Sequence, residues 1–313
     1  MEYLWLVVGF VLLIKGADFF VDGASSIAGK LKVPSLIIGL TVVSMGTSMP
    51  EAAVSISASL SGSNEISLGN VIGSNIFNLL MVVGISAIIL PVASDKDMLK
   101  RDMPINIGIT AVLMVMLLDG ELGRIDSVIL LVLMVAYILM LIRSALKNRE
   151  EGEDTKTYSW LLSIVFVVAG AGAIIGGGQL VVNSATTIAT SLGMSETLVG
   201  LTIVAIGTSL PELVTSVVAA KKGDSGIAMG NAVGSCIFNI LFILGMAGVI
   251  QPMKTQDNSF FIDTGILIGV SALMLLFAFT KKKTGRLEGA TCVLIYVAYT
   301  AYIIMRAYGI WIF

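Results

Sequence analysis

Two short motifs combine a carboxylate with hydroxyl groups inside apolar sequence. They read GTSMPE at Gly46–Glu51 and GTSLPE at Gly207–Glu212. In each motif the Thr and the Ser lie four and three residues before the Glu, so a helix would place the three side chains on one face. Carboxylate and hydroxyl oxygens are ligands for hard cations such as Na⁺, Ca²⁺ and Mg²⁺. Each motif therefore predicts part of a cation site.

A proline precedes the glutamate in both motifs. Pro50 and Pro211 cannot donate a backbone hydrogen bond and clash with the carbonyl four residues back, at Gly46 and Gly207. Loosened backbone within an apolar span is tolerated where it is buried in protein or lines a cavity, and its free carbonyls can bind a cation. Because Mg²⁺ loses its hydration water reluctantly, Ca²⁺ and Na⁺ suit such a dry site better.

A second polar pattern follows each motif on the next predicted helix, with an Asn or Ser at every fourth residue. The positions are Asn70, Ser74 and Asn78 in the first half and Asn231, Ser235 and Asn239 in the second. Their oxygens could extend the cation site, or they could form hydrogen bonds between helices. We favour the cation site for the last two positions of each series, and both interpretations stay open at Asn70 and Asn231.

The motifs belong to an internal repeat with an offset of 161 residues. Segments 39–89 and 200–250 align without a gap, and 23 of their 51 positions are identical. After a one-residue insertion the match resumes, for example at Tyr137 and Tyr299. The repeat therefore covers nearly the whole of each half of the chain.

The elements that must position these side chains are membrane-spanning helices. Charged residues make up 13% of the chain, against about 25% in a soluble domain, and 56% of the residues are hydrophobic. A net charge of −2 without a basic stripe argues against a nucleic-acid partner. The sequence contains no His, the commonest zinc ligand and general base, and an enzyme is not expected.

We predict an all-α, polytopic membrane protein of ten transmembrane helices, because a span needs about 20 mostly apolar residues. The apolar stretches lie at 3–29, 34–60, 66–90, 103–118, 125–142, 159–190, 196–220, 226–250, 260–280 and 288–310.

The ten spans form two five-helix repeats. We expect the first repeat at 1–142, a linker at 143–158 and the second repeat at 159–313. Because five is odd, the second repeat enters the membrane from the opposite side, and inverted repeats of this kind are typical of transporters. If the N-terminus lies outside, the cytoplasmic loops hold 15 Lys and Arg and the external side holds 3; Lys15, within the first span, completes the 19. This asymmetry predicts a cell-membrane protein with both termini outside and a cytoplasmic linker.

The two G-T-S-x-P-E motifs, each followed by G-N-x-x-G-S-x-I-F-N, resemble the α-repeats of the cation/calcium exchanger superfamily, most closely its prokaryotic sodium/calcium exchanger-like branch. The resemblance implies Na⁺-driven, electrogenic Ca²⁺ antiport through a central site. It implies Ca²⁺ binding by Glu51 and Glu212, with Thr47 and Thr208 contributing. The Na⁺ ligands it implies are Ser48, Ser209, Ser74, Ser235, Asn78 and Asn239, with the backbone of Ser44 and Ala205 as outer ligands.

Some members of the superfamily carry Asp in the second repeat, where this chain has Asn239, so the predicted site has two carboxylates only. One alternative on the same scaffold is a Ca²⁺/H⁺ or other cation/H⁺ antiporter in which Glu51 and Glu212 load protons. A passive cation channel is disfavoured, because a pore usually repeats around an axis normal to the membrane. We expect a monomer in the lipid bilayer that transports Ca²⁺ and Na⁺ and needs no cofactor.

Overall fold

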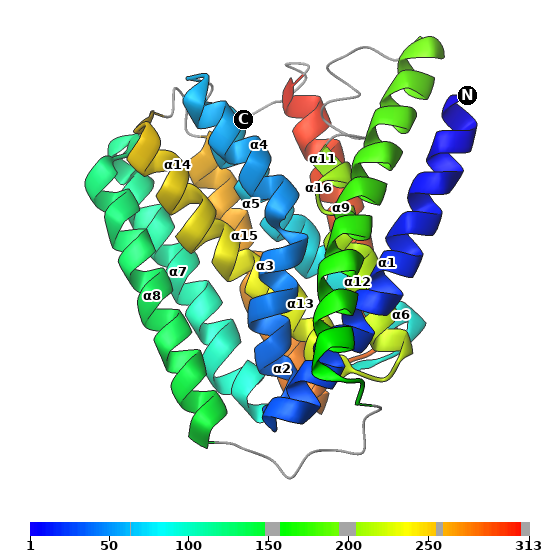
Figure 1. The fold of residues 1–313 in the computed structure, drawn as a ribbon. Helices are drawn as coiled ribbons and strands as arrows, with labels where there is room; N and C mark the ends of the chain where they lie inside the picture. The colour runs from blue at the N-terminus through cyan, green and yellow to red at the C-terminus, as the bar shows by residue number, and fades with distance from the viewer. Residues whose placement is uncertain (63, 148–156, 194–204, 255–258, 308–313) are drawn as a thin grey trace.

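A computed structural model describes residues 1–62, 64–147, 157–193, 205–254 and 259–307 of the chain as a bundle of long helices (Figure 1). The elements of the first half are α1 (Glu2–Leu31), α2 (Ser35–Ile38), η1 (Gly39–Val43), α3 (Ser44–Thr47), α4 (Met49–Leu60), α5 (Asn64–Phe77), η2 (Asn78–Val82), α6 (Val83–Ile89), β1 (Val92–Ala93), η3 (Met98–Asp102), α7 (Met103–Met116), η4 (Leu117–Asp119), β2 (Glu121–Leu122) and α8 (Arg124–Lys147). Those of the second half are α9 (Trp160–Ser191), α11 (Ala205–Gly207), α12 (Leu210–Lys221), α13 (Ser225–Phe238), η6 (Asn239–Leu244), α14 (Gly245–Ile250), β3 (Met253–Lys254), α15 (Ser259–Lys281), β4 (Lys283–Thr284) and α16 (Arg286–Ala307).

The helices account for the predicted spans within the described ranges. Eight are long and apolar enough to cross a membrane, and a ninth span is the bent pair Ser35–Thr47 and Met49–Leu60. The predicted span 196–220 falls partly outside the described residues, and its described part consists of α11 and α12. The all-α fold class is thus confirmed.

Two predicted helix ends are wrong. The span expected at 125–142 continues to Lys147, because Arg143 to Lys147 are good helix formers, so the expected linker start at 143 lies inside α8. The span expected at 103–118 begins earlier, at Met98, and takes in Arg101, which we counted as a loop charge. Residues 148–156 of the linker lie outside the described residues.

The first helices of the two halves pack against one another in opposite directions, through glycines that let the backbones approach closely. A Cβ added at Gly9 would lie 2.9 Å from the Gly177 carbonyl oxygen, and one added at Gly16 would lie 3.0 Å from the Gly170 carbonyl oxygen. As the residue number rises along α1, the number of the contacting residue on α9 falls, so the two helices are antiparallel. Since Gly9 and Gly16 are the repeat counterparts of Gly170 and Gly177, the two halves are inverted relative to one another.

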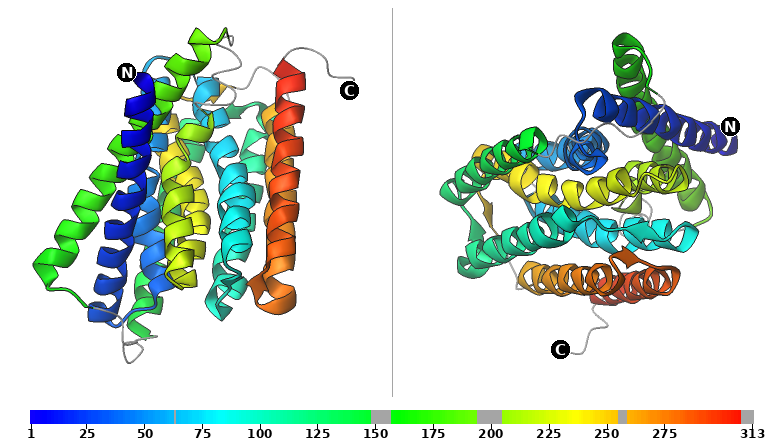
Figure 2. Two further views of the ribbon diagram at one scale, coloured as in Figure 1. Left: turned by 90° about the vertical axis from the view of Figure 1, so that its right-hand side faces the viewer. Right: turned by 90° about the horizontal axis from the view of Figure 1, so that it is seen from below.

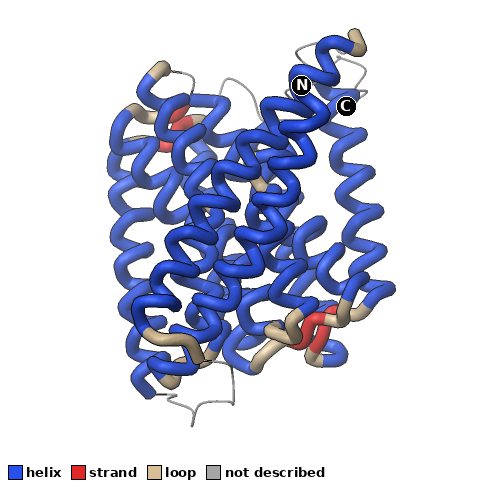
Figure 3. Tube along the Cα trace, turned by 45° about the vertical axis from the view of Figure 1, so that its right-hand side comes forward, coloured by secondary structure: helices blue, strands red, loops and turns tan. Residues whose placement is uncertain are grey.

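The short strands show the same inversion. β1 pairs with β4 and β2 pairs with β3, both antiparallel. By the repeat, β3 is the counterpart of β1, and β4 is the counterpart of β2, so exchanging the two halves converts one sheet into the other. The sheets lie at opposite ends of the bundle, as Figure 3 shows. This places a pseudo-two-fold axis across the bundle rather than along it.

The helices that carry the second polar pattern lie at the centre of the bundle. Seen from below, α5 and α13 run between the α1–α9 pair and the α15–α16 pair (Figure 2). Their spans, Ile66–Ile89 and Ser225–Ile250, are the most buried of the eight long apolar helices that the structure describes, with 72% and 78% of their apolar windows inside the protein. A polar side chain on these helices therefore has protein, not lipid, around it.

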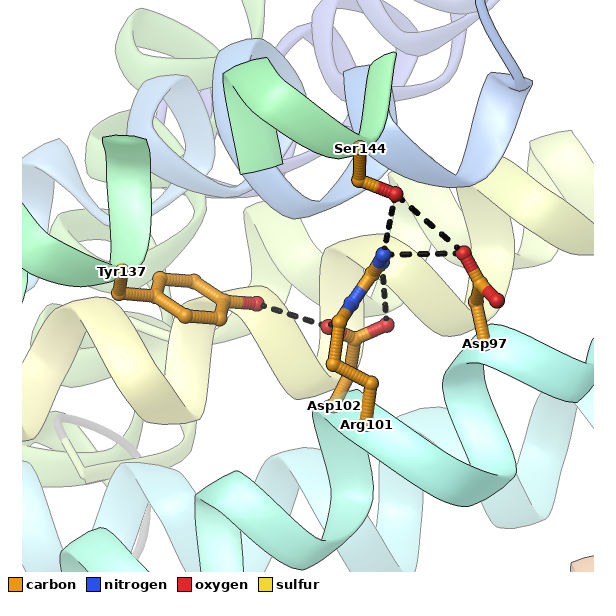
Figure 4. Close-up of polar contacts among 5 residues, drawn as sticks. All are labelled: Asp97, Arg101, Asp102, Tyr137 and Ser144. Atoms are coloured by element: carbon orange, nitrogen blue, oxygen red, sulfur yellow. Dashed lines mark hydrogen bonds and ion pairs between the residues drawn. The ribbon is translucent and has the colours of Figure 1, made fainter. Parts of the chain in front are cut away.

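A buried ion-pair network fastens the start of the α7 span to α8 (Figure 4). The Arg101 guanidinium donates to both carboxylate oxygens of Asp102, at 2.8 and 3.0 Å, to Asp97 Oδ2 at 2.9 Å and to Ser144 Oγ at 2.6 Å. Tyr137 Oη donates to Asp102 Oδ1 at 3.4 Å. The charge of the fully buried Asp102 is thus paired with that of Arg101, which lies in the helical span rather than in a loop.

The second half has a related ion pair at the equivalent position of the repeat. Asp263 follows Asp102 at the offset of 161, and its carboxylate accepts two hydrogen bonds from Arg306, at 3.1 and 2.8 Å. Here the arginine comes from α16, the counterpart of α8, rather than from the helix that carries the aspartate. Both halves thus tie their fourth and fifth spans together with a largely buried carboxylate.

Candidate cation site

Both Gly-Thr-Ser-x-Pro-Glu motifs break their helix at the same position. Ser48 has φ −83° and ψ 9°, and its counterpart Ser209 has φ −94° and ψ 8°. A new helix starts directly afterwards, with Pro50 or Pro211 in its first turn, and in the first half the axis bends by 50°. This is the break that the proline and glycine predicted.

The break places each glutamate in the first turn of a 12-residue helix, α4 or α12. Backbone N–H groups at a helix N-terminus favour negative charge. The side chains of Glu51 and Glu212 are fully buried, and no ion pair among the described residues includes either of them. A charged carboxylate at these positions therefore has no cationic side chain beside it in the described part of the chain to offset the cost of its burial.

The two motifs meet through reciprocal hydrogen bonds across the halves. Ser48 Oγ donates to Glu212 Oε1 at 2.8 Å, and Ser209 Oγ donates to Glu51 Oε1 at 3.0 Å. The repeat exchanges these two bonds, so the pseudo-two-fold axis passes between them. The two carboxylates consequently belong to one site rather than to two separate sites.

The remaining oxygen of each carboxylate is free for another partner. Glu51 Oε2 and Glu212 Oε2 are buried and accept no hydrogen bond from the described residues. The hydroxyl of Thr208, also buried, has no partner within the same ranges. Buried acceptors of this kind carry a desolvation cost unless a proton or a cation binds them.

Asn70 and Asn231 hold the glutamate-bearing helices from the adjacent span. Asn70 Nδ2 donates to the Glu51 carbonyl at 3.2 Å, and Asn231 Nδ2 donates to the Glu212 carbonyl at 3.1 Å. The same amides donate to Ser55 Oγ and Ser216 Oγ, both at 2.9 Å. The interhelical interpretation therefore describes both Asn70 and Asn231.

The two threonines are placed differently. Thr47 Oγ1 donates to Asn231 Oδ1 at 2.9 Å, and this bond crosses from the first half to the second. The equivalent bond from Thr208 to Asn70 does not form, since Thr208 Oγ1 is without a partner in the described structure. The two halves of the site thus differ in this hydrogen bond although their motif sequences match.

The other predicted ligands that the structure describes are buried in the spans next to the two motifs. The Ser44 carbonyl accepts from Ser48 N at 3.0 Å, Thr47 Oγ1 at 3.3 Å and Ser235 Oγ at 3.5 Å. Ser74 is buried on α5, and Asn78 and Asn239 are fully buried at the start of the π-helical turns η2 and η6. Ala205 begins α11, and its side chain lies outside what the structure describes.

One central residue was missed from the sequence. Asn75 is fully buried on α5; its Nδ2 donates to the Cys236 carbonyl at 3.0 Å, and its Oδ1 accepts from Asn239 Nδ2 at 3.0 Å. The available signal was a mismatch in the repeat, since Cys236 stands where the second half would otherwise carry Asn.

The donor set is made of hard oxygens: carboxylate, hydroxyl, amide and carbonyl. Among the described residues there is no group of three or more His, Cys, Asp or Glu side chains that could hold a metal ion, so the carboxylates at this position number two. Two carboxylates with neutral oxygens suit Na⁺ or Ca²⁺. The fold and the site together define a membrane transporter built from inverted repeats.

The chain belongs to the sodium/calcium exchanger protein family, whose model matches residues 1–143 and 162–305. It is 36% identical over 286 residues to the inner membrane protein YrbG of Escherichia coli, with 88% of each chain covered. It is 35% identical over 345 residues to the sodium/calcium exchanger MaX1 of Methanosarcina acetivorans, with 95% of this chain and 97% of the relative covered.

Solved structures of the sodium-calcium exchanger NCX_Mj have the same fold. One of them superposes with a TM-score of 0.85 at 33% identity, covering 96% of this chain and 98% of the other. The resemblance found in the sequence motifs is therefore confirmed, as is the ten-helix exchanger fold.

Proposed function

We propose that the protein exchanges Na⁺ for Ca²⁺ across the cell membrane by alternating access. The observation that carries the proposal is the pair of buried carboxylates, each bound to a serine of the opposite half and each with one oxygen that has no hydrogen-bond partner among the described residues. One Ca²⁺ or two Na⁺ would neutralise Glu51 and Glu212. Because both ions require the same two charges, the site is satisfied by either ion but not by both together.

Alternating access follows from the inverted repeat. Two halves with matching sequences can exchange conformations, which gives outward-open and inward-open states of similar energy. The unequal environments of Thr47 and Thr208 support this, since one half has formed its threonine bond and the other has not. Exchange of these two arrangements would open the site to one side and close it to the other.

The proposed ion site includes the residues that the resemblance indicates. Ca²⁺ is bound by Glu51 and Glu212 with the two threonines, and the further oxygens are Na⁺ ligands. These are Ser48, Ser209, Ser74, Ser235, Asn78 and Asn239, with the carbonyls of Ser44 and Ala205. We further propose that the protein acts as a monomer, with both termini outside and the linker in the cytoplasm.

Ca²⁺ uptake into vesicles tests the proposal. Purified protein is reconstituted into liposomes that are loaded with Na⁺, with choline or with buffer at low pH. Dilution into Na⁺-free medium at neutral pH then creates an outward gradient of Na⁺, of choline or of H⁺, and ⁴⁵Ca²⁺ uptake is measured. Na⁺/Ca²⁺ exchange predicts uptake into the Na⁺-loaded vesicles only. Uptake driven by the H⁺ gradient alone would instead support a cation/H⁺ antiporter, and uptake in choline would support a passive channel.

A further inference from the structure

Asn75 and Cys236 contact one another across the pseudo-two-fold axis at the centre of the bundle. They are counterparts in the repeat, 161 positions apart, and both are fully buried. Asn75 Nδ2 donates to the Cys236 carbonyl at 3.0 Å, and Cys236 Sγ lies 3.6 Å from the Asn75 carbonyl as a weak donor. The backbone contact is therefore nearly symmetric, while the side chains are not.

The Asn75 side chain determines how a neighbouring amide is turned. Its Nδ2 must face the Cys236 carbonyl, because a carbonyl can only accept, and its Oδ1 then faces Asn239. Asn239 must therefore donate through its Nδ2, which lies 3.0 Å from Asn75 Oδ1. Asn239 Oδ1 is thereby turned away from Asn75, and it is buried with no partner among the described residues.

The amide at the equivalent position of the first half, Asn78, is not held in this way. Asn78 is the counterpart of Asn239, and the residue that would orient it is Cys236, which has no amide oxygen to offer. Both Asn78 Oδ1 and Asn78 Nδ2 are buried and lack a partner in the described ranges. One half of the site thus carries a fixed amide and the other a free one.

We propose that Asn75 is a positioning residue, which fixes the Asn239 amide so that its oxygen is presented to the transported cation. The inference rests on the proposed function and adds that the two halves contribute unequally: Asn239 is a pre-oriented ligand, whereas Asn78 must be oriented by the ion itself. Ordering a ligand before binding lowers the cost of binding. Loss of Asn75 therefore weakens ion affinity without removing a ligand.

The variant Asn75→Cys tests this, because Cys is the residue that the same buried environment accepts at 236. Reconstituted Na⁺-dependent ⁴⁵Ca²⁺ uptake gives the half-saturating concentrations of Na⁺ and Ca²⁺ and the maximal rate. We expect a rise of about five- to tenfold in at least one half-saturating concentration, the size of one positioned hydrogen bond. The maximal rate is expected to change little, whereas the thermal midpoint is expected to fall, because two buried hydrogen bonds are lost.

The matched control is Asn106→Cys, the same substitution at a buried Asn that donates to Ser271 Oγ at 3.2 Å on the α7–α15 contact and has no hydrogen bond to a proposed site residue among the described residues. Its half-saturating concentrations are expected to match those of the wild type. A second comparison combines Asn75→Cys with Asn239→Ala. If Asn75 acts through Asn239, the double variant matches Asn239→Ala alone; effects that add would contradict the inference.

The exchange variant Asn75→Cys with Cys236→Asn provides a rescue. It moves the orienting amide to the other half, where it can hold Asn78, and we expect it to recover most of the affinity lost in Asn75→Cys. A wild-type protein without exchange activity would contradict the proposed function itself. An active wild type whose affinities are unchanged by Asn75→Cys would contradict only the role of Asn75.

Discussion

Ser48 Oγ donates to Glu212 Oε1 at 2.8 Å, and at the equivalent positions of the repeat Ser209 Oγ donates to Glu51 Oε1 at 3.0 Å. Each half of the protein thus supplies a carboxylate to the site and a hydroxyl to the carboxylate of the other half. This crossed arrangement puts the proposed ion site at the interface between the repeats, where relative movement of the halves would act directly on it.

Replacement of either serine by alanine is expected to weaken ion binding to a similar degree. Ser48→Ala and Ser209→Ala each remove one hydrogen bond to a carboxylate, and the half-saturating Ca²⁺ concentration in the vesicle assay should rise by roughly tenfold. Ser86→Ala, at a buried serine on α6 without a partner in the described residues, is the control and should have no effect. Equal affinities for all three variants would speak against the crossed bonds.

Glycine substitutions test the close packing of α1 against α9. A Cβ added at Gly170 would lie 2.7 Å from Phe20 N and 2.8 Å from the Gly16 carbonyl oxygen, and backbone atoms cannot move aside without separating the helices. We expect Gly170→Ala to lower stability by about 1–3 kcal/mol, measured by thermal unfolding in detergent. Gly172→Ala lies on the same helix with nothing within 4 Å of the added Cβ and should be neutral or slightly stabilising. A similar melting temperature for both variants would contradict the packing.

The ion-pair network around Asp102 makes a separate prediction about stability. Asp102→Asn removes the buried carboxylate that accepts two hydrogen bonds from Arg101, which keeps only its pair with Asp97, and we expect a cost of about 1.5–3 kcal/mol. Asp97→Asn breaks the pair of the same arginine with a carboxylate that is 42% exposed, and this should cost about 1 kcal/mol or less. Thermal or denaturant unfolding distinguishes the two variants. If Asp97→Asn were the more destabilising of the two, the network would not anchor the helix as described.

The sequence was sufficient to predict the repeat, its inversion and the glutamates, because these depend on spacing and on the cost of a carboxylate among apolar residues. It also predicted the breaks at Ser48 and Ser209, which follow from local backbone chemistry. The hydrogen bonds of Asn75 could not be predicted, because they depend on which of its amide atoms faces a carbonyl of the other half. Likewise, Arg101 was taken for a loop charge, since nothing in the sequence shows that Asp102 and Ser144 surround it.

In the proposed mechanism, Ca²⁺ and Na⁺ compete for a single site that contains Glu51 and Glu212. Equilibrium binding of ⁴⁵Ca²⁺ to the purified protein tests it directly, with Glu212→Gln as the site variant and Glu288→Gln, on α16, as the control. We predict one saturable Ca²⁺ site per chain that is displaced by Na⁺ but not by choline, retained in Glu288→Gln and lost in Glu212→Gln. Ca²⁺ binding that persists in excess Na⁺, or that survives in Glu212→Gln, would contradict the account.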